Sequence, residues 1–129
     1  MKFRLLAALL FAPLAAWAAY PEMTSLKPHG GQIGAEVRLT ITGARLDDFE
    51  DLMFYTPGFK VKSVESRATN KVELTLSIDK SVRAGNHVMR VRTKSGVSHM
   101  RQFFASPFPN VEEKEPNSEF AGAQGLVKA

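Results

Sequence analysis

Four carboxylates gather in the segment LDDFEDL: Asp47, Asp48, Glu50 and Asp51. Hard oxygen ligands clustered on one loop are the kind that Ca²⁺ prefers, so these residues are weak candidates for a metal site. The segment lacks the spacing of an EF-hand loop and its glycine. We therefore expect a solvated acidic turn between two strands, and we predict no bound metal.

The three histidines, His29, His87 and His99, show no metal-binding spacing such as HExxH. His87 and His99 fall near the last two predicted strands and on opposite faces, whereas metal ligands must converge on one ion. We expect His87 to be a core or rim histidine with a backbone partner. His29 is expected in a solvated turn.

The residue pattern gives no support for nucleophilic catalysis. The chain has no cysteine, which excludes a disulfide framework, thiolate chemistry and cysteine-ligated zinc. Ser95 and Ser98 lie in a predicted hairpin without the GxSxG turn of a nucleophilic serine, and the serines and threonines look like outward strand residues. We predict that this segment is not an enzyme and holds no cofactor.

Four arginines, Arg38, Arg90, Arg92 and Arg101, are the best candidates for a binding surface. The strand pairing preferred below places Arg90 opposite Arg101, and like charges directly opposed destabilise a sheet. An acidic partner, an anionic polysaccharide or a carboxylate within the protein would offset this repulsion. The alternative, which we favour, is that the long side chains splay into solvent and screen each other.

Three aromatic residues, Phe49, Tyr55 and Phe59, lie in or just before the segment DLMFYTPGF. Exposed aromatic side chains on a loop can dock a partner domain or stack on sugar rings, so Tyr55 and Phe59 join the candidate binding surface. The same residues could instead close one end of a sandwich, which is the commoner use.

Alternating apolar and polar residues predict the strands that position these side chains. In EVRLTITG, Val37, Leu39 and Ile41 share one face, and KVELTLSID and NHVMRVRT repeat the pattern. Glycine, proline and asparagine fill the gaps. The predicted fold is an all-β, immunoglobulin-like two-sheet sandwich. Its roughly seven antiparallel strands lie at about 23–27, 35–43, 51–55, 59–66, 71–78, 87–93 and 97–105.

The last hairpin allows two registers. A two-residue turn over 95–96 packs Val91 on Met100, whereas a three-residue loop pairs Val91 with His99. A slip of one residue exchanges the two faces of a strand. We prefer the first register, because it gives the better core.

The N-terminus reads as a secretory signal peptide. The basic start MKFR precedes the apolar run LLAALLFAPLAAW, and AWA offers small residues for cleavage after Ala18. Removal of 1–18 leaves 15 basic residues against 13 acidic ones, a net charge of +2. We therefore expect an exported protein, periplasmic, cell-surface or extracellular, with no nucleic-acid partner and no membrane span after cleavage.

The order of these signals resembles an IPT/TIG immunoglobulin-like domain over about residues 21–105. The matching positions are Pro28, Gly31 and Gly34 at the turn, Val37, Leu39, Ile41 and Gly43 in the next strand, and Gly85, Met89, Val91, Gly96 and Ser98 near the end. Two features depart from the family pattern: LMF replaces the usual valine-led strand, and His87 stands where an aromatic is commoner.

The C-terminal segment VEEKEPNSEFAGAQGL resembles the opening of a bacterial pre-peptidase C-terminal (PPC) domain. Glu113, Glu115, Pro116, Asn117, Ala121, Ala123 and Gln124 match that opening. The combination resembles large exported proteins of planctomycete-like bacteria. It implies a signal peptide at 1–18, a sandwich at 19–105, an acidic Pro-rich linker at 106–119 and the truncated start of a further domain at 120–129, which looks like a strand without its sheet.

These expectations favour a non-catalytic module for domain spacing and for binding protein or polymer within a larger exported protein. Its partners would be neighbouring domains of the same polypeptide and an extracellular protein or polysaccharide. Two alternatives stay open. The segment could be an accessory part of a secreted peptidase or other hydrolase whose catalytic domain lies beyond residue 129, or it could be a carbohydrate-binding module.

Overall fold

The computed structural model describes residues 19–115 and 119–125, and the predicted signal peptide at 1–18 lies outside them. The described strands are β1 (Glu22–Lys27), β2 (Gly30–Gln32), β3 (Glu36–Ala44), β4 (Phe49–Phe54), β5 (Phe59–Ala68), β6 (Lys71–Ile78), β7 (Gly85–Thr93), β8 (Gly96–Val97) and β9 (Arg101–Ser106). A 3-10 helix, η1, spans Phe120–Gly122. Across the two described ranges, no helix is long and apolar enough to cross a lipid bilayer.

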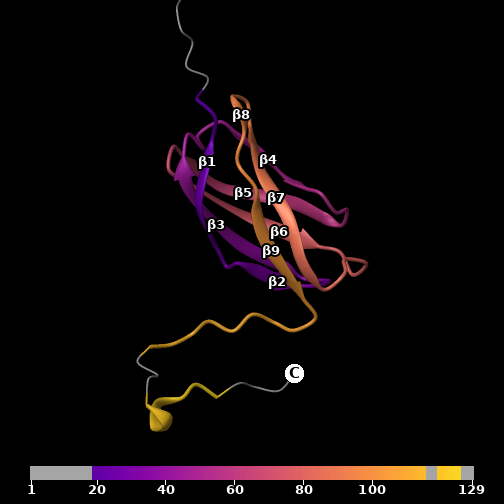
Figure 1. Cartoon of the computed structure of the whole chain (residues 1–129), viewed down its shortest axis with the longest axis vertical. Helices are drawn as coiled ribbons and strands as arrows, with labels where there is room; N and C mark the ends of the chain where they lie inside the picture. Colours follow the sequence, from indigo (N-terminus) through magenta and orange to yellow (C-terminus); the bar gives the residue numbers. More distant parts are fainter. Residues whose placement is uncertain (1–18, 116–118, 126–129) are drawn as a thin grey trace, which may run out of the picture.

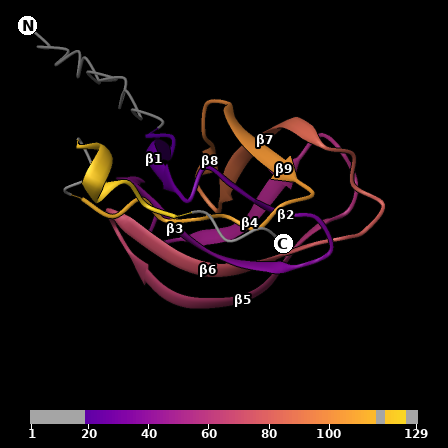
Figure 2. The ribbon, with the colours of Figure 1, turned by 90° about the horizontal axis from the view of Figure 1, so that it is seen from below.

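The strands form two sheets packed face to face. The four-stranded sheet has the order β1-β3-β6-β5, and the five-stranded sheet has the order β2-β9-β7-β4 with β8 beside β7. Seen from below, β3, β6 and β5 curve beneath β7 and β9 (Figure 2). This arrangement confirms the predicted all-β two-sheet sandwich.

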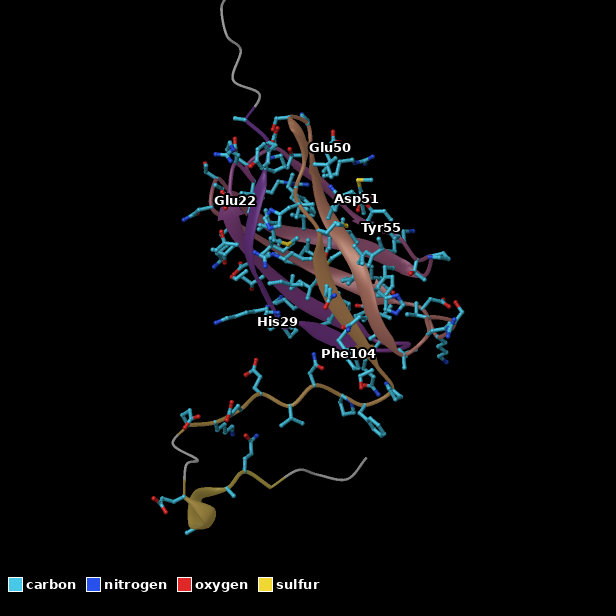
Figure 3. The ribbon with its side chains drawn as sticks, viewed as in Figure 1. Glu22, His29, Glu50, Asp51, Tyr55 and Phe104 are labelled. Carbon is cyan, nitrogen blue, oxygen red and sulfur yellow. The ribbon has the colours of Figure 1, made fainter. Side chains whose placement is uncertain are left out.

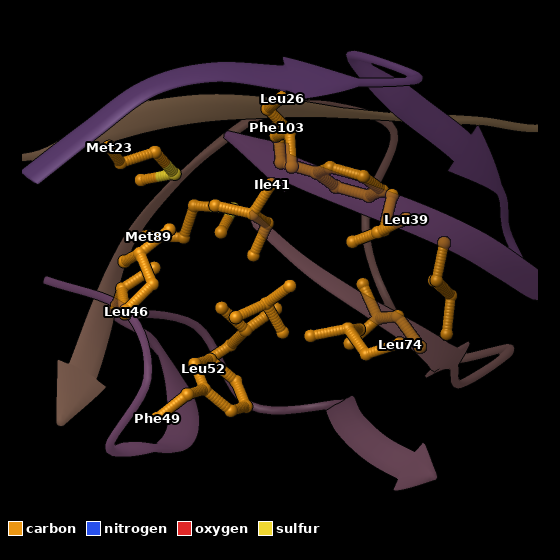
Figure 4. Close-up of a cluster of buried hydrophobic side chains, with 14 of the residues drawn as sticks. Met23, Leu26, Leu39, Ile41, Leu46, Phe49, Leu52, Leu74, Met89 and Phe103 are labelled. Atoms are coloured by element: carbon orange, nitrogen blue, oxygen red, sulfur yellow. The ribbon is translucent and has the colours of Figure 1, made fainter. Parts of the chain in front are cut away.

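The alternating apolar residues meet between the sheets. Across β3 and β6, Leu39 pairs with Leu74 and Ile41 with Val72, and all four side chains are fully buried. Met89, Val91 and Phe103 reach the same core from the five-stranded sheet (Figure 4). Full burial of an aliphatic or aromatic side chain contributes about 1.5–3 kcal/mol, so this cluster is the main source of stability in a chain without disulfides.

None of the predicted strands corresponds to β2, and the predicted antiparallel pairing is wrong at this strand. β2 runs parallel to β9, with Gly30 opposite Phe104. Its sequence GGQ offers neither alternation nor β-branched residues, so no periodic signal marks it. The glycine is required, because a Cβ on Gly30 would lie 2.3 Å from the Phe104 carbonyl oxygen.

The predicted last strand at 97–105 is two strands. β8 follows a two-residue turn at Lys94 and Ser95, since Thr93 pairs with Gly96. β9 begins only at Arg101, after residues 98–100, which belong to neither strand. The turn therefore lies one residue earlier than the preferred register places it.

The preferred pairing of the last hairpin is also wrong. Arg101 lies opposite Met89 and not opposite Arg90. This pairing is the register that the three-residue loop would give. Met100 is 56% exposed instead of packed on Val91. Since Arg90 and Arg101 do not face each other across the strands, the predicted repulsion between them does not arise.

Two hydroxyl side chains expected to point outward are buried. Ser98 is 0% exposed and Thr93 is 4% exposed. The Ser98 hydroxyl oxygen accepts a hydrogen bond from the Val91 amide (2.9 Å) and donates one to the His99 carbonyl (2.9 Å). The Ser98 amide donates to the Val91 carbonyl (2.9 Å), so the hydroxyl takes the place of the Ser98 carbonyl as the acceptor at the step between β8 and β9.

The segment after β9 leaves the bottom of the sandwich in an extended conformation (Figure 1). Two side chains tie it to the free edge of β2. Gln32 Nε2 donates to the Pro107 carbonyl (3.3 Å), and Asn110 Nδ2 donates to the Gly30 carbonyl (2.5 Å). The exit from the sandwich is therefore anchored to β2.

The C-terminal residues turn back on the linker. Gln124 Nε2 donates to the Glu112 carbonyl (2.9 Å), and Gln124 Oε1 accepts from the Lys114 amide (3.0 Å). Within the described residues from Phe120 onward there is the short helix η1 in place of the expected strand. Residues 116–118 and 126–129 of the predicted PPC opening lie outside the described residues.

Candidate functional site

The acidic segment 47–51 is divided among different partners. Asp48 Oδ2 accepts hydrogen bonds from the Ser95 hydroxyl (2.8 Å) and the Ser95 amide (2.9 Å). The Ser95 hydroxyl is the larger cause that holds the pKa of the Asp48 carboxyl below its usual range. Asp51 Oδ1 accepts from the Leu52 amide (2.8 Å), and Glu50 lies 3.5 Å from Arg92 Nε.

These contacts direct the carboxylates to protein donors. Glu50 occupies the register shift between Phe49 and Asp51, so adjacent acids leave the strand in different directions. In the part of the chain that the structure describes, no three His, Cys, Asp or Glu side chains are arranged to hold a metal ion. Figure 3 labels Glu50 and Asp51 at the upper end of β4.

His87 is the core histidine that the sequence predicts. It is buried, and its Nε2 donates a hydrogen bond to the Arg83 carbonyl (2.7 Å). The ring also meets the Phe59 ring edge-on, with centroids 5.0 Å apart. His29 and His99 are exposed, so His29 lies in solvent as expected.

The two candidate aromatics have different places. Phe59 stacks on Phe54 with a centroid distance of 4.0 Å, and both rings meet Phe103 edge-on. Since Phe54 comes from β4 and Phe59 from β5, this stack closes the space between the two sheets. Phe49, grouped with them in the sequence, belongs to the buried core. Phe59 is therefore a packing residue that closes one end of the sandwich, as the commoner of the two expected uses.

Tyr55, by contrast, is 63% exposed at the end of β4. Its amide donates to the Val88 carbonyl (3.1 Å), which extends the β4–β7 pairing by one residue. Met53, the preceding solvent-facing residue of β4, is opposite Arg90. Tyr55 and Met53 thus stand on the solvent side of the five-stranded sheet.

Phe104 is a second exposed ring on the same side, and the sequence analysis did not single it out. It is 49% exposed on β9 and lies opposite Asn86, while Gln102 lies opposite Val88. The hairpin register decides which of Phe103 and Phe104 points outward, because a slip of one residue exchanges their faces. The correct register therefore identifies Phe104 as the exposed ring. We call the solvent-facing side chains of β4, β7 and β9 the outer face: Met53, Tyr55, Val88, Arg90, Gln102 and Phe104.

The spacing of the outer face follows from its pairing. Tyr55, Val88 and Gln102 form one row across three strands, so Tyr55 and Gln102 are about 10 Å apart at the usual strand spacing. Phe104 lies two residues further along β9, about 7 Å from Gln102. The backbone positions of Tyr55 and Phe104 are therefore about 12 Å apart, diagonally across the sheet.

Arg90 lies between the strands that carry these rings. Its guanidinium donates to the Ser98 carbonyl (3.2 Å), and its Nε is buried without a hydrogen-bond partner among the described protein atoms. The side chain is therefore held against the sheet instead of splaying into solvent. Arg92, two residues away, extends toward Glu50 at 3.5 Å.

The four candidate arginines do not form one surface. Arg90 and Arg92 lie on the outer side of β7, whereas Arg38 is on β3 of the other sheet. Arg101 lies where the two sheets meet: it donates to the Met23 carbonyl (2.9 and 3.1 Å) and to the Thr24 carbonyl (3.0 Å) of β1. Of the six predicted binding residues, the structure brings Arg90, Arg92 and Tyr55 to one side of one sheet.

Two grooves border the outer face. The β1–β9 groove, about 510 Å³, runs between the edges of the two sheets and is lined by Ser25, Leu26, His29, Met100, Arg101 and Gln102, among others. The linker groove, about 920 Å³, lies between the sandwich and the segment after β9. Lys27, His29, Arg38 and Phe104 line it from the sandwich, and Glu112 and Glu113 from the linker.

No family model matches this sequence, and no curated protein matches it. A solved structure with a similar arrangement is the Bacteroides ovatus mixed-linkage glucan utilization locus protein SGBP-B in complex with a mixed-linkage heptasaccharide. The TM-score is 0.49 at 18% sequence identity, and the match covers 67% of this chain. The chain spans 24% of the length of that protein.

Proposed function

We propose that this chain is an exported, immunoglobulin-like binding module of the IPT/TIG kind that holds a polysaccharide on the outer face. The observation that carries the proposal is the pair of exposed rings, Tyr55 and Phe104, on one side of one sheet. Phe49, Phe54, Phe59 and Phe103 pack in or against the core, whereas Tyr55 and Phe104 share one exposed side of a sheet with the apolar Met53 and Val88, and a grouped apolar surface is typical of a binding site.

The chemistry of the outer face suits a sugar chain. The apolar face of a pyranose ring packs on an aromatic ring, and its hydroxyls need donors and acceptors at the side. Gln102 offers an amide between the two rings, and Arg90 offers a guanidinium already fixed by Ser98. Rings carried on backbone positions about 12 Å apart would engage different sugars of the same chain, which favours a polymer over a monosaccharide.

The spacing part of the proposal is supported by the exit from the sandwich. Asn110 fixes the start of the linker on β2, and Gln124 closes a loop on residues 112–114. A following domain would therefore leave from a defined point of the sandwich. Export is supported by the signal-peptide pattern at 1–18.

Retention of the purified chain on a panel of immobilised polysaccharides tests this function. We expect at least one polysaccharide to bind, and Tyr55→Ala and Phe104→Ala each to weaken that binding about tenfold, the equivalent of one lost stacking contact. Phe108→Ala is the matched control, since Phe108 is also an exposed ring (68%) but lies on the linker. Absence of binding across the panel, or equal weakening by Phe108→Ala, would reject the proposal.

A further inference from the structure

The two grooves beside the outer face adjoin at His29, which lines both of them. Val88 and Gln102 of the outer face line the β1–β9 groove, and Phe104 of the same face lines the linker groove. Figure 3 shows His29 and Phe104 at the same end of the sandwich. A polymer that crosses the outer face can therefore continue into the grooves.

The charges along these grooves are one-sided. The sandwich contributes Lys27, Arg38 and Arg101 and no carboxylate to the lining, while the acids of the lining, Glu112 and Glu113, belong to the linker. Closely spaced cations over a low-dielectric surface raise the local concentration of anions. The grooves thus differ in charge from the upper end of β4 and β7, where Glu50 lies beside Arg92.

Among the described residues, none of these three cations forms a salt bridge within the sandwich. The salt bridges recorded between described residues use Arg45, Lys62, Lys71 and Arg92, and none of these lines a groove. Arg101 is bound to backbone carbonyls, which leave its charge intact.

Two carboxylates lie near Arg38, and both are engaged by other side chains. Glu73 forms a salt bridge with Lys71 (2.8 Å). Glu65 accepts hydrogen bonds from Ser63 (2.6 Å) and Thr75 (2.8 Å). The charge of Arg38 still acts on both carboxylates, so the cation that Arg38 presents to the linker groove is partly offset by Glu65 and Glu73.

We infer that the grooves bind the carboxylate groups of a uronate-bearing polysaccharide, and that the acidic linker is a tethered competitor for the same cations. The inference rests on the proposed function, because the grooves prolong the outer face. It adds the class of polymer: an acidic one, with sugar rings on Tyr55 and Phe104 and carboxylates near Lys27, Arg38 and Arg101.

The linker is placed to act as such a competitor. Asn110 holds its start at β2, so Glu112 and Glu113 remain at the groove at a high effective concentration. An added polyanion must compete with the negative charge of these carboxylates in the linker groove. Release would leave the Asn110 anchor in place, because Asn110 is neutral and bonds to the Gly30 carbonyl.

Hydroxyl and amide groups favour a polysaccharide over an acidic peptide as the occupant. Ser25 and Gln102 line the β1–β9 groove, and Thr40 lines the linker groove. Such groups match the many hydroxyls of a sugar chain, and the aromatic face continues the same surface.

Binding of the purified chain to polygalacturonate, dextran and poly-L-glutamate tests the inference, in low salt and in about 1 M NaCl. We expect polygalacturonate to bind more tightly than the other two in low salt and to lose that advantage in high salt. Lys27→Gln/Arg38→Gln should weaken polygalacturonate binding about tenfold. Glu112→Gln/Glu113→Gln should strengthen it severalfold, since the tethered competitor loses its charge.

Matched controls come from charges outside the grooves. Lys60→Gln removes a cation from β5, and Glu119→Gln removes an acid from the tail; neither should change polygalacturonate binding. Equal weakening by Lys60→Gln would reduce the effect to net charge and overturn the inference. Poly-L-glutamate binding as tight as that of polygalacturonate would assign the grooves to an acidic peptide instead.

The inference and the proposed function fail separately. Dextran and polygalacturonate could bind equally, with binding weakened by Tyr55→Ala and unaffected by Lys27→Gln/Arg38→Gln. This result would reject the grooves as a binding site and keep the outer face. Polygalacturonate binding that depends on Lys27 and Arg38 but not on Tyr55 would support the grooves as the binding site and reject that role for the outer face. No binding of polygalacturonate, with binding of another polysaccharide of the panel, would remove the grooves alone, and absence of binding across the whole panel would remove both.

Discussion

The Arg101 guanidinium donates two hydrogen bonds, at 2.9 and 3.1 Å, to the carbonyl oxygen of Met23. Arg101 starts β9 in the five-stranded sheet, and Met23 lies in β1, the edge strand of the four-stranded sheet. A third bond reaches the Thr24 carbonyl (3.0 Å). One side chain therefore joins the two sheets and blocks part of a free strand edge, which would otherwise be open to pairing with another chain.

Loss of this link should lower the stability of the fold. We expect Arg101→Gln to reduce the free energy of unfolding by about 1–2 kcal/mol, because a charged donor to backbone carbonyls is lost. Urea denaturation followed by circular dichroism measures the change. Arg92→Gln is the control: Arg92 forms an exposed ion pair with Glu50, and such pairs contribute less than about 1 kcal/mol. Equal losses in the two variants would contradict a special role for Arg101.

The strands around Arg101 show why the two sheets could be predicted from the sequence but the register of every strand pair could not. Periodicity located β3, β6 and β7 well, because each alternates along its whole length. It could not settle the β7–β9 register, since both candidate registers buried plausible apolar residues. The deciding contact is Ser98, a polar residue whose hydroxyl fills the gap between β8 and β9. Binary patterning does not encode that contact.

Ser98 should therefore be sensitive to a small change. Ser98→Ala leaves the buried Val91 amide without its acceptor, which costs about 1–3 kcal/mol of unfolding free energy. Thermal unfolding of the variant measures this loss. Ser63→Ala, on the exposed strand β5, is the control and should change stability by less than about 0.5 kcal/mol. A neutral Ser98→Ala variant would show that the Val91 amide finds another acceptor.

The two aromatic candidates should separate in experiment. Phe59→Ala should lower the unfolding free energy by about 2–4 kcal/mol, because the ring stacks on Phe54 and touches Phe103. Tyr55→Ala should change it by less than about 0.5 kcal/mol, because that ring is exposed. Chemical denaturation of both variants gives the comparison. A strongly destabilised Tyr55→Ala would remove Tyr55 from the outer face as a binding residue.

Sequence alone could not assign these two roles. Tyr55 stands just before the turn signal at 56–58 and Phe59 just after it, and their neighbours are similar in composition. What separates them is which sheet each strand joins: β4 and β5 lie in different sheets, so Phe59 turns toward Phe54 across the interior. The outer-face position of Phe104 also depends on pairing and not on residue type.

Gly43 is a further position where the backbone approach fixes the residue. A Cβ at Gly43 would lie 1.8 Å from the Glu22 carbonyl oxygen of the neighbouring strand β1. Gly43→Ala must push β1 away from β3, so we expect a loss of about 1–3 kcal/mol. Differential scanning calorimetry measures it. Gly125→Ala, where nothing lies within 4 Å of the added atom, is the control and should leave the melting temperature unchanged.

Asp48 should give the fold a pH-dependent contribution. The Ser95 hydroxyl and amide hold the pKa of the Asp48 carboxyl below its usual range, so the folded state binds a proton less readily than the unfolded state. The stabilisation is therefore complete above the unfolded pKa of about 3.9 and is lost as pH falls through the lower folded value. Asp48→Asn should cost about 0.5–1 kcal/mol at neutral pH, a modest amount because the group is partly solvated.

Urea denaturation of wild type and Asp48→Asn at neutral pH and near pH 3 measures this dependence. The difference in unfolding free energy should shrink at the lower pH, because protonation removes the wild-type advantage. Asp47→Asn removes the same charge from an exposed neighbour without touching Ser95, so it controls for net charge. A difference between wild type and Asp48→Asn that stays constant with pH would mean that Asp48 acts through the shape of the turn and not through its ionised carboxylate.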